Sequence, residues 1–192
     1  EIKIINNKSD EGKQVGIIGE LQGGYVSHID MKNISAKGFQ GVSALIGSVS
    51  GNYNYISNCY LTNDENHSIY STGKYAGGIV GNNQIENALA SNGGVDYLNI
   101  SNCGVQATIG DVNGGGYTAG ILGRTKNLGR TKNDSNIYTT IIKNCYFKGT
   151  IASQGNYCAG IAGDFEAGDG QTYINGCYSD VRFIYQGEIF DI

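Results

Sequence analysis

The chain has 192 residues, with 31 glycines, 14 tyrosines, no proline and a formal net charge of −4. Its 40% content of hydrophobic residues argues against intrinsic disorder, and its acidic balance argues against nucleic acid as a partner. No stretch approaches the roughly 20 apolar residues that a transmembrane helix needs, so we expect no membrane insertion. Because the chain begins at Glu1 without a signal-like segment, we expect a processed form or a segment of a longer protein.

A glycine-rich phrase recurs in chain order as GKQVGIIG, GFQGVSALIG, GKYAGGIVG, GGYTAGILG and GNYCAGIAG. The second copy departs most from the pattern, with Ser43 and Ala44 where other copies have an Ala-Gly pair. The closing glycines are separated by 28, 34, 42 and 40 residues, a period that is typical of stacked repeat arrays. These closing glycines are Gly19, Gly47, Gly81, Gly123 and Gly163.

A second phrase, built around Ile-x-Asn-Cys, alternates with the glycine phrase. The segment MKNISA is interpreted as a degenerate member with Ile34 in place of cysteine, and KIINNK near the start as an earlier one. The clear members are YISNCYLT from Tyr55, LNISNCGVQAT from Leu98, TIIKNCYFKGT from Thr140 and TYINGCYSDV from Thr172.

Short runs rich in Ile, Val, Tyr, Thr and Cys, bounded by Gly, Asn, Asp and Ser, predict strands in both phrases. The equivalence of the repeats favours parallel stacking of like on like. Polar insertions follow the closing glycines at 82–96, 124–137 and 164–171, which places them at one corner of each unit. We therefore predict an all-β, single-domain fold over residues 1–192, a parallel β-helix (β-solenoid) of about five coils with loops inserted at one corner. A β-sandwich is the structural alternative.

The repeated glycines are interpreted as structural. A corner of a coil needs a positive φ, and neighbouring strands need close approach; glycine supplies both. A phosphate-binding loop is the functional alternative, since Gly114, Gly116 and Gly120 roughly match its spacing. Such a loop should be unique and open a helix, whereas this phrase recurs about five times and opens none. The structural interpretation is therefore favoured.

The two phrases together resemble the GLUG-motif repeats, with the best matches at Tyr75 to Gly81, Tyr117 to Gly123 and Tyr157 to Gly163. These repeats belong to large bacterial surface and secreted proteins, including the non-catalytic N-terminal parts of immunoglobulin A-specific metallopeptidases and adhesin-like proteins. The resemblance covers nearly the whole chain. It implies a right-handed β-helix on an exported protein, located outside the cell or at the bacterial cell surface.

Two polar columns follow from the alignment of the second phrase. Equivalent cysteines should lie roughly 4.8 Å apart in a line and point inward as free thiols, because a line suits neither a disulfide nor a tetrahedral zinc site. The asparagines before them predict an amide ladder, with a ligand-binding row as the alternative. Cys158 lies outside the column. The predicted ladder residues are Cys59, Cys103, Cys145 and Cys177, with Asn58, Asn102 and Asn144.

Metal and catalytic groupings are sparse. No cofactor is expected except calcium, for which Asp164, Glu166 and Asp169 in GDFEAGDGQ offer oxygen ligands near tight turns. His28 and His67 have no repeated partner, so we interpret both as solvated loop residues. No catalytic grouping of Ser, His and acid, of Cys and His, or of two histidines around zinc follows from the spacing.

The corner loops are the predicted binding elements. The duplicated GRTKN segment places four cations, Arg124, Lys126, Arg130 and Lys132, on an exposed corner that can contact an anionic glycan or a protein, or have no selected role. Tyrosines that recur by position are expected to be packing ladders rather than a sugar-binding platform; they are Tyr60, Tyr146 and Tyr178, and Tyr75, Tyr117 and Tyr157.

These observations favour a non-catalytic structural or adhesive repeat domain of an exported bacterial surface protein, whose corner loops bind a host or cell-surface glycan or protein. The alternative is a polysaccharide-active enzyme, either a lyase or a hydrolase, on a β-helix. Hydrolysis needs two carboxylates on one face, and acids are sparse within the strand phrases, Asp180 being an exception.

Overall fold

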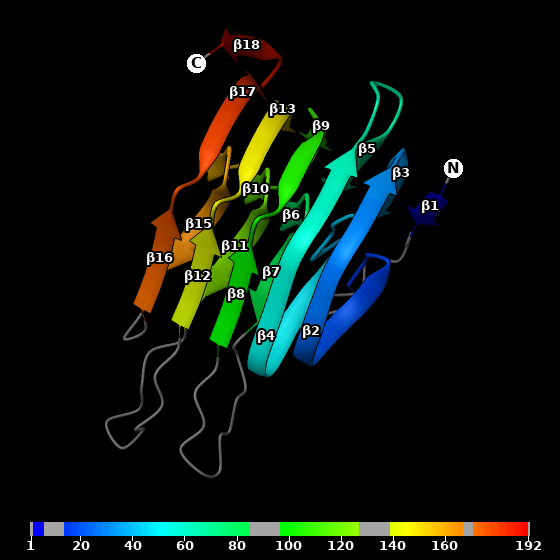
Figure 1. Cartoon of the computed structure of the whole chain (residues 1–192). Coiled ribbons are helices and arrows are strands. Elements are labelled where there is room, and N and C mark those ends of the chain that lie inside the picture. Colours follow the sequence, from blue (N-terminus) through cyan, green and yellow to red (C-terminus); the bar gives the residue numbers. More distant parts are fainter. Residues whose placement is uncertain (1, 6–13, 85–96, 127–138, 167–170, 192) are drawn as a thin grey trace.

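The computed structural model describes residues 2–5, 14–84, 97–126, 139–166 and 171–191 (Figure 1). Every regular element in these ranges is a β-strand, and nearly all strand pairs are parallel, so the predicted all-β class is confirmed. The strands are β1 (Ile2–Ile5), β2 (Ile18–Lys32), β3 (Ile34–Gly38), β4 (Ile46–Thr62), β5 (Ser68–Ser71), β6 (Ala76–Gly77), β7 (Val80–Gln84), β8 (Tyr97–Ser101), β9 (Gly104–Gly110), β10 (Thr118–Ala119), β11 (Leu122–Lys126), β12 (Thr139–Lys143), β13 (Tyr146–Ser153), β14 (Cys158–Ala159), β15 (Ala162–Glu166), β16 (Gln171–Asn175), β17 (Tyr178–Tyr185) and β18 (Glu188–Asp191).

Each strand stacks on its equivalent in the next repeat, so like residues form columns. In the ladder β2–β4–β8–β12–β16, one inward column is Val26, Ile56, Ile100, Ile142 and Ile174. Ile100 and Ile142 are 0% exposed, whereas Ile174 in the last strand of this ladder is 47% exposed. Burial of this column therefore comes from the neighbouring strands of the stack as well as from the interior.

A second ladder begins where the first ends. The last residues of β2 and β4 pair onward to β9, β13 and β17. Its inward column runs through Met31, Leu61, Val105 and Phe147, all of them buried. Strands β1, β3 and β5 extend the same sheet, and β18 pairs antiparallel with the end of β17.

The glycine phrase forms the third side of the stack. The first residues of β2 and β4 align with β7, β11 and β15, and the short strands β6, β10 and β14 form a separate parallel sheet. A Cβ added to Gly123 would lie 2.5 Å from the carbonyl oxygen of Gly81 and 2.7 Å from that of Ala76. None of the five closing glycines has a positive φ. Close approach is therefore the role of Gly47, Gly81, Gly123 and Gly163, whereas a Cβ on Gly19 would meet nothing within 4 Å. The predicted positive φ of the glycine phrase falls not on the closing glycines but on Gly41, and on Tyr117 and Tyr157 in later copies.

Left-handed backbone also occurs at the turn between the first two ladders. Asn58, Asn102 and Asn144 have φ values of 52°, 52° and 51°, and Gly176 and His28 occupy the same turn with 62° and 58°. Asparagine is one of the few residues that adopts this conformation at modest cost. The shape of the turn therefore favours asparagine in this column.

The register corrects one alignment made from the sequence. β2 pairs Tyr25 with Tyr55 and Ile29 with Cys59, so the first copy of the second phrase is YVSHIDMK and not MKNISA. Ile34 belongs to β3, in a different ladder. The glycine-phrase copy with Ser43 and Ala44 keeps its register, because Val42 pairs with Ala76 and Ile46 with Val80.

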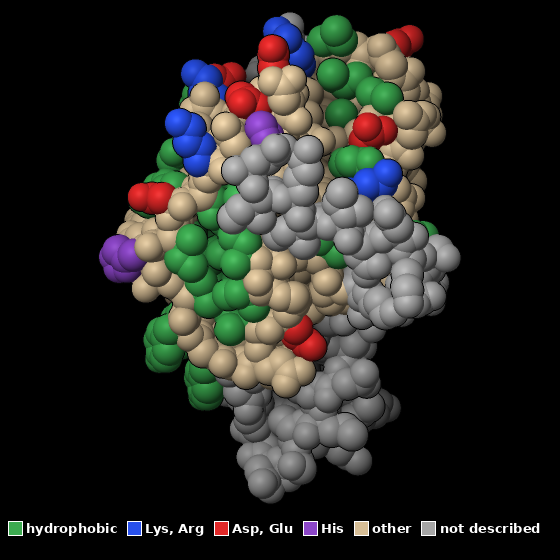
Figure 2. All heavy atoms as spheres, turned by 90° about the vertical axis from the view of Figure 1, so that its right-hand side faces the viewer, with side chains coloured by type: hydrophobic (Ala, Val, Ile, Leu, Met, Phe, Trp, Pro, Cys, Tyr) green, Lys and Arg blue, Asp and Glu red, His purple; other side chains and the backbone are tan. Residues whose placement is uncertain are grey.

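The two ends of the stack leave strand edges without a neighbour among the described residues. Figure 2, which views the molecule from the side of β1 and β2, shows hydrophobic side chains gathered at that end. Ile17 and Tyr25 are exposed there, as are Tyr173 and Ile174 on β16 at the other end. No helix in the described ranges is long and apolar enough to cross a membrane.

Candidate functional site

The outward side of the second ladder carries an exposed row of tyrosines. The register aligns Asp30, Tyr60, Gly104, Tyr146 and Tyr178 in one row. Two residues further along each strand, a polar row aligns Lys32, Thr62, Gln106, Lys148 and Asp180. Alternate residues of a strand point to the same side, so both rows face outward. We call these ten residues the tyrosine face.

Gly104 determines how the rings lie on this face. A Cβ on Gly104 would meet the Tyr146 ring, with Cε1 at 2.2 Å and Cζ at 2.3 Å. The Tyr146 ring therefore occupies the space that a side chain at 104 would fill, and it leans toward Tyr60. Two strand spacings amount to roughly 9.6 Å, yet the Tyr60 and Tyr146 ring centroids lie only 6.5 Å apart. Tyr146 remains 40% exposed and Tyr178 60% exposed.

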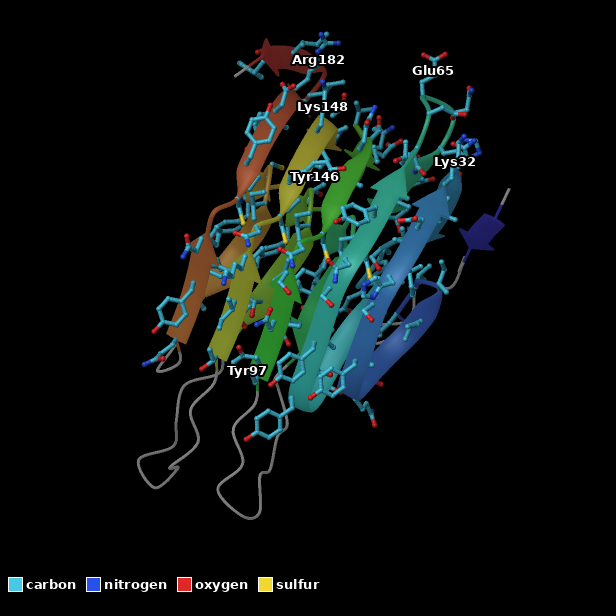
Figure 3. The ribbon with its side chains drawn as sticks, viewed as in Figure 1. Lys32, Glu65, Tyr97, Tyr146, Lys148 and Arg182 are labelled. Atoms are coloured by element: carbon cyan, nitrogen blue, oxygen red, sulfur yellow. The ribbon has the colours of Figure 1, made fainter. Side chains whose placement is uncertain are left out.

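The polar row supplies hydrogen-bonding groups beside these rings. Lys148 Nζ lies 3.7 Å from Asp180 Oδ2, and both side chains are more than half exposed. Gln106 is exposed between them and Thr62. Figure 3 shows Tyr146 and Lys148 in the upper half of the stack, together with Lys32 and Arg182, whereas Tyr97 lies at the lower end of the strands. With Asp30 and Lys32 included, the face carries two positive and two negative side chains.

A different arrangement holds the tyrosines of the first ladder. The rings of Tyr25 and Tyr55 are stacked, with centroids 4.7 Å apart and planes at 3°. Tyr97 contacts Tyr55 at 5.3 Å, and Asn99 donates a hydrogen bond to the Tyr97 hydroxyl at 3.1 Å. Each stacked ring covers a face of its neighbour, so this group is a packing ladder.

Arg124 belongs to a third tyrosine group and is not the exposed loop cation that the sequence predicted. It lies in β11, its side chain is only 12% exposed, and its Nε is 3.3 Å from Asp164 Oδ2. Its guanidinium lies 4.8 Å from the Tyr75 ring centroid and 5.5 Å from that of Tyr117, and it donates a hydrogen bond to the Tyr75 hydroxyl. Tyr117 in turn stacks on Tyr157 at 4.9 Å. Arg124 therefore ties neighbouring repeats together.

The other predicted corner residues are only partly placed. Lys126 ends β11 and pairs in register with Glu166 of β15, while Arg130, Lys132 and Asp169 lie outside the described residues. Asp164 is engaged by Arg124. In the part of the chain that the structure describes, no three His, Cys, Asp or Glu side chains come together to hold a metal ion. The calcium prediction, which includes Asp169, stays a prediction.

Cys59, Cys103, Cys145 and Cys177 form a thiol column behind the left-handed turn, buried except at Cys177 in the last repeat. Each thiol donates to a carbonyl of the preceding repeat: Cys103 Sγ to Ile56 at 3.9 Å and Cys145 Sγ to Ile100 at 3.6 Å. All five cysteines are free, and burial raises the pKa of the Cys177 and Cys158 thiols. Thiols that lie in the interior and donate to carbonyl oxygens act as small core residues.

The asparagine and histidine predictions have separate outcomes. Asn144 Nδ2 donates to Asn102 Oδ1 at 3.3 Å, which is an amide ladder contact at the surface. His28 is exposed but occupies the left-handed position of the turn. His67 is buried, and its Nδ1 lies 2.5 Å from Asp64 Oδ1, so the prediction that it is a solvated residue is wrong.

A groove of about 800 Å³ lies beside the last repeat, between the turn that precedes β14 and the β17–β18 hairpin. Tyr157, Phe183, Tyr185 and Phe190 line it, with Gly155, Asn156 and Cys158. These residues hold the last register positions of their ladders, where earlier repeats are covered by the next one. The groove is therefore the uncovered side of the last stacked turn.

Sequence reasoning found the recurrence of Tyr60, Tyr146 and Tyr178 but assigned it to packing. The Tyr60 and Tyr146 rings are in contact, in agreement with that assignment. Sequence reasoning did not use Gly104, which takes the tyrosine position in the copy ISNCGVQ between ISNCYLT and IKNCYFK. A glycine in that column removes one ring, so the Tyr146 ring on the next strand can occupy the space beside residue 104.

No protein-family model and no curated protein matches the chain. Among solved structures, it is similar to the crystal structure of a "putative immunoglobulin A1 protease" from Bacteroides ovatus, with 17% sequence identity and a TM-score of 0.49. The similarity covers 92% of this chain and 63% of that chain, so this chain spans less than two thirds of its neighbour's length. A likeness of this kind concerns the arrangement of the backbone and not activity.

Proposed function

We propose that this chain is a non-catalytic adhesive repeat domain of an exported bacterial surface protein, wound as a right-handed β-helix of about five coils. The resemblance of its phrases to GLUG-motif repeats motivates the location and the winding. In this proposal a stiff stack presents side chains and corner loops to a glycan or protein partner outside the cell.

The observation that carries the proposal is the contrast between a repeated interior and a varied exterior. The inward column from Val26 to Ile174 contains only Val and Ile, whereas the outward polar row changes from Lys32 to Thr62, Gln106, Lys148 and Asp180. The interior keeps hydrophobic side chains in every repeat, as the buried column Met31, Leu61, Val105 and Phe147 also does. An exterior that differs at each repeat supports specific recognition by the assembled surface, because no single repeat contains the whole pattern.

The corner loops remain part of the proposal. They follow β7, β11 and β15, and they include Arg130 and Lys132 in the second copy of GRTKN. Lys126, at the end of β11, lies where that loop begins. Arg124 is left out of this binding set, because it is held between Tyr75 and Asp164.

Bead adhesion tests this function. Beads coated with the chain are placed on surfaces that carry immobilised glycans, fibronectin or collagen, and retention under flow is measured. Retention on at least one surface, without release of reducing ends from soluble polysaccharides, is the expected result. Retention on none of them would overturn the adhesive function. Release of reducing ends would favour the polysaccharide-active enzyme instead.

A further inference from the structure

We infer that the tyrosine face is a binding site for an uncharged, β-linked hexopyranose chain that lies across the strands. This inference rests on the proposed adhesive function and names the surface and the class of ligand. It assigns the contact to Tyr60, Tyr146 and Tyr178, with hydrogen bonds from Gln106 and Lys148.

The first support is the availability of ring surface. Sugar rings present a face of C–H groups that packs against an aromatic ring, so an aromatic side chain binds sugar only where its own face is uncovered. The Tyr146 ring rests in the space above Gly104, on the backbone side, and 40% of the residue remains exposed on the solvent side. In the first ladder, by contrast, the Tyr55 ring lies between those of Tyr25 and Tyr97 and contacts both, while Tyr25 at the end of the row stays 80% exposed. The tyrosine face thus presents tyrosine rings that are partly exposed to solvent and available for contact with a sugar.

The second support is the geometry of the row. Tyr60, Gly104, Tyr146 and Tyr178 lie on four successive strands of a parallel ladder, each roughly 4.8 Å from the next. That step is close to the length of one sugar unit in an extended β-linked chain. A chain that runs along the stack axis therefore meets successive strands with successive sugar units.

The third support is the polar row and its charge. Gln106, Lys148 and Asp180 lie two residues further along the same strands than the tyrosine row, so they flank the rings with groups that can hydrogen-bond to sugar hydroxyls. The two lysines of the face are balanced by its two aspartates, and Lys148 is paired with Asp180. A face without net charge gives no electrostatic preference for an acidic glycan, so it fits an uncharged one.

Isothermal titration of the chain with cellohexaose, laminarihexaose and mannohexaose tests the inference, with oligogalacturonate as the acidic counterpart. At least one neutral hexasaccharide is expected to bind. Tyr146→Ala should then weaken its affinity about tenfold or more, as is usual when a central aromatic contact is removed. Gly104→Ala should weaken it similarly, because the new Cβ displaces the ring at a point where only a flexible side chain must move. Tyr55→Ala, in the stacked ladder, is the matched control and should leave the affinity unchanged.

The remaining outcomes separate this inference from the proposed function. Unchanged affinity in Tyr146→Ala and Gly104→Ala, with loss in the Arg130→Ala and Lys132→Ala double variant, would move the site to the corner and overturn the inference alone. Binding of oligogalacturonate only, or of fibronectin or collagen only, would likewise overturn the inference and leave adhesion standing. Binding of none of these probes would overturn both. Circular dichroism of each variant verifies that it is folded, and Gly104→Ala provides a second test if Tyr146→Ala is not.

Discussion

Two groups of tyrosines lie on the same stack and use their rings in opposite ways. Tyr25 and Tyr55 stack face to face at 4.7 Å, so each ring is part of the packing. In the tyrosine face, Gly104 interrupts the row, and Tyr146 lies over it with its outer side exposed. A repeated aromatic residue is thus structural where successive rings stack on one another. It becomes available to a ligand where a glycine breaks the row.

The largest expected effect is on stability, and it distinguishes two glycines, Gly123 and Gly104, whose tolerance of a side chain cannot be told from sequence alone. Gly123→Ala should destabilise the chain by about 3 kcal/mol, because its Cβ would press on two backbone oxygens that cannot move apart easily. Gly104→Ala should cost less than about 1 kcal/mol, because its Cβ meets only the end of the Tyr146 side chain. Urea unfolding of both variants measures the difference. Equal losses would mean that the Tyr146 ring is as rigidly held as the backbone.

A smaller effect is expected at the turn that joins the two tyrosine-bearing ladders. Asn102 has a φ of 52°, and alanine in that conformation costs about 1–2 kcal/mol. Asn102→Ala should therefore lower the free energy of unfolding by about that amount. Asn102→Gly should keep most of the wild-type free energy of unfolding. The urea midpoints of the two variants provide the measurement. An alanine variant as stable as the glycine variant would show that the turn does not need the left-handed backbone.

The tyrosine comparison itself predicts the next effect. Tyr55→Ala removes a ring that contacts both Tyr25 and Tyr97, and it should cost about 1 kcal/mol beyond the loss of buried area. Tyr178→Ala removes a ring that is 60% exposed and should cost clearly less. Thermal unfolding of the two variants compares them directly. If Tyr178→Ala were the more damaging change, its ring would be part of the packing.

The smallest effect concerns the turn that follows Thr62 at the border of the tyrosine face. The hydrogen bond from His67 lowers the pKa of the Asp64 carboxyl below its ordinary value. A lowered folded pKa adds stability above about pH 4, and this contribution is lost as the pH falls through the folded pKa. Wild type should therefore lose more thermal stability than Asp64→Asn between pH 5 and strongly acidic conditions, a pH window that follows from the lowered carboxyl pKa. Parallel acid profiles for the two proteins would contradict this account of the turn.

The sequence predicted the all-β class and the stacking of like on like because recurrence of Ile-x-Asn-Cys and of the closing glycine is a direct consequence of a repeated unit. It failed in the first repeat, where Ile29 replaces the cysteine that anchored the alignment. The Tyr-x-Ser spacing shared by Tyr25 and Tyr55 would have found the correct register.

The candidate site was less predictable, because side-chain direction depends on three-dimensional neighbours. Arg124 follows a closing glycine in a polar stretch and therefore suggested a loop, yet β11 continues through it and two tyrosine rings and Asp164 surround it. Tyr146 was recognised as a repeated position. The orientation of its ring, however, is decided by residue 104 in the adjacent strand, because a side chain there would occupy the space that the ring fills. Sequence patterns define which residues are equivalent, and register defines what each one contacts.

The most direct test of this account is an NMR titration of the isotopically labelled chain with cellohexaose, laminarihexaose and mannohexaose in turn. The account predicts that the hexasaccharide that binds shifts the Gly104 amide signal and the ring signals of Tyr60, Tyr146 and Tyr178. The ring signals of Tyr25, Tyr55 and Tyr97 should stay in place. Shifts confined to those three rings, with the Gly104 amide unmoved, would contradict it.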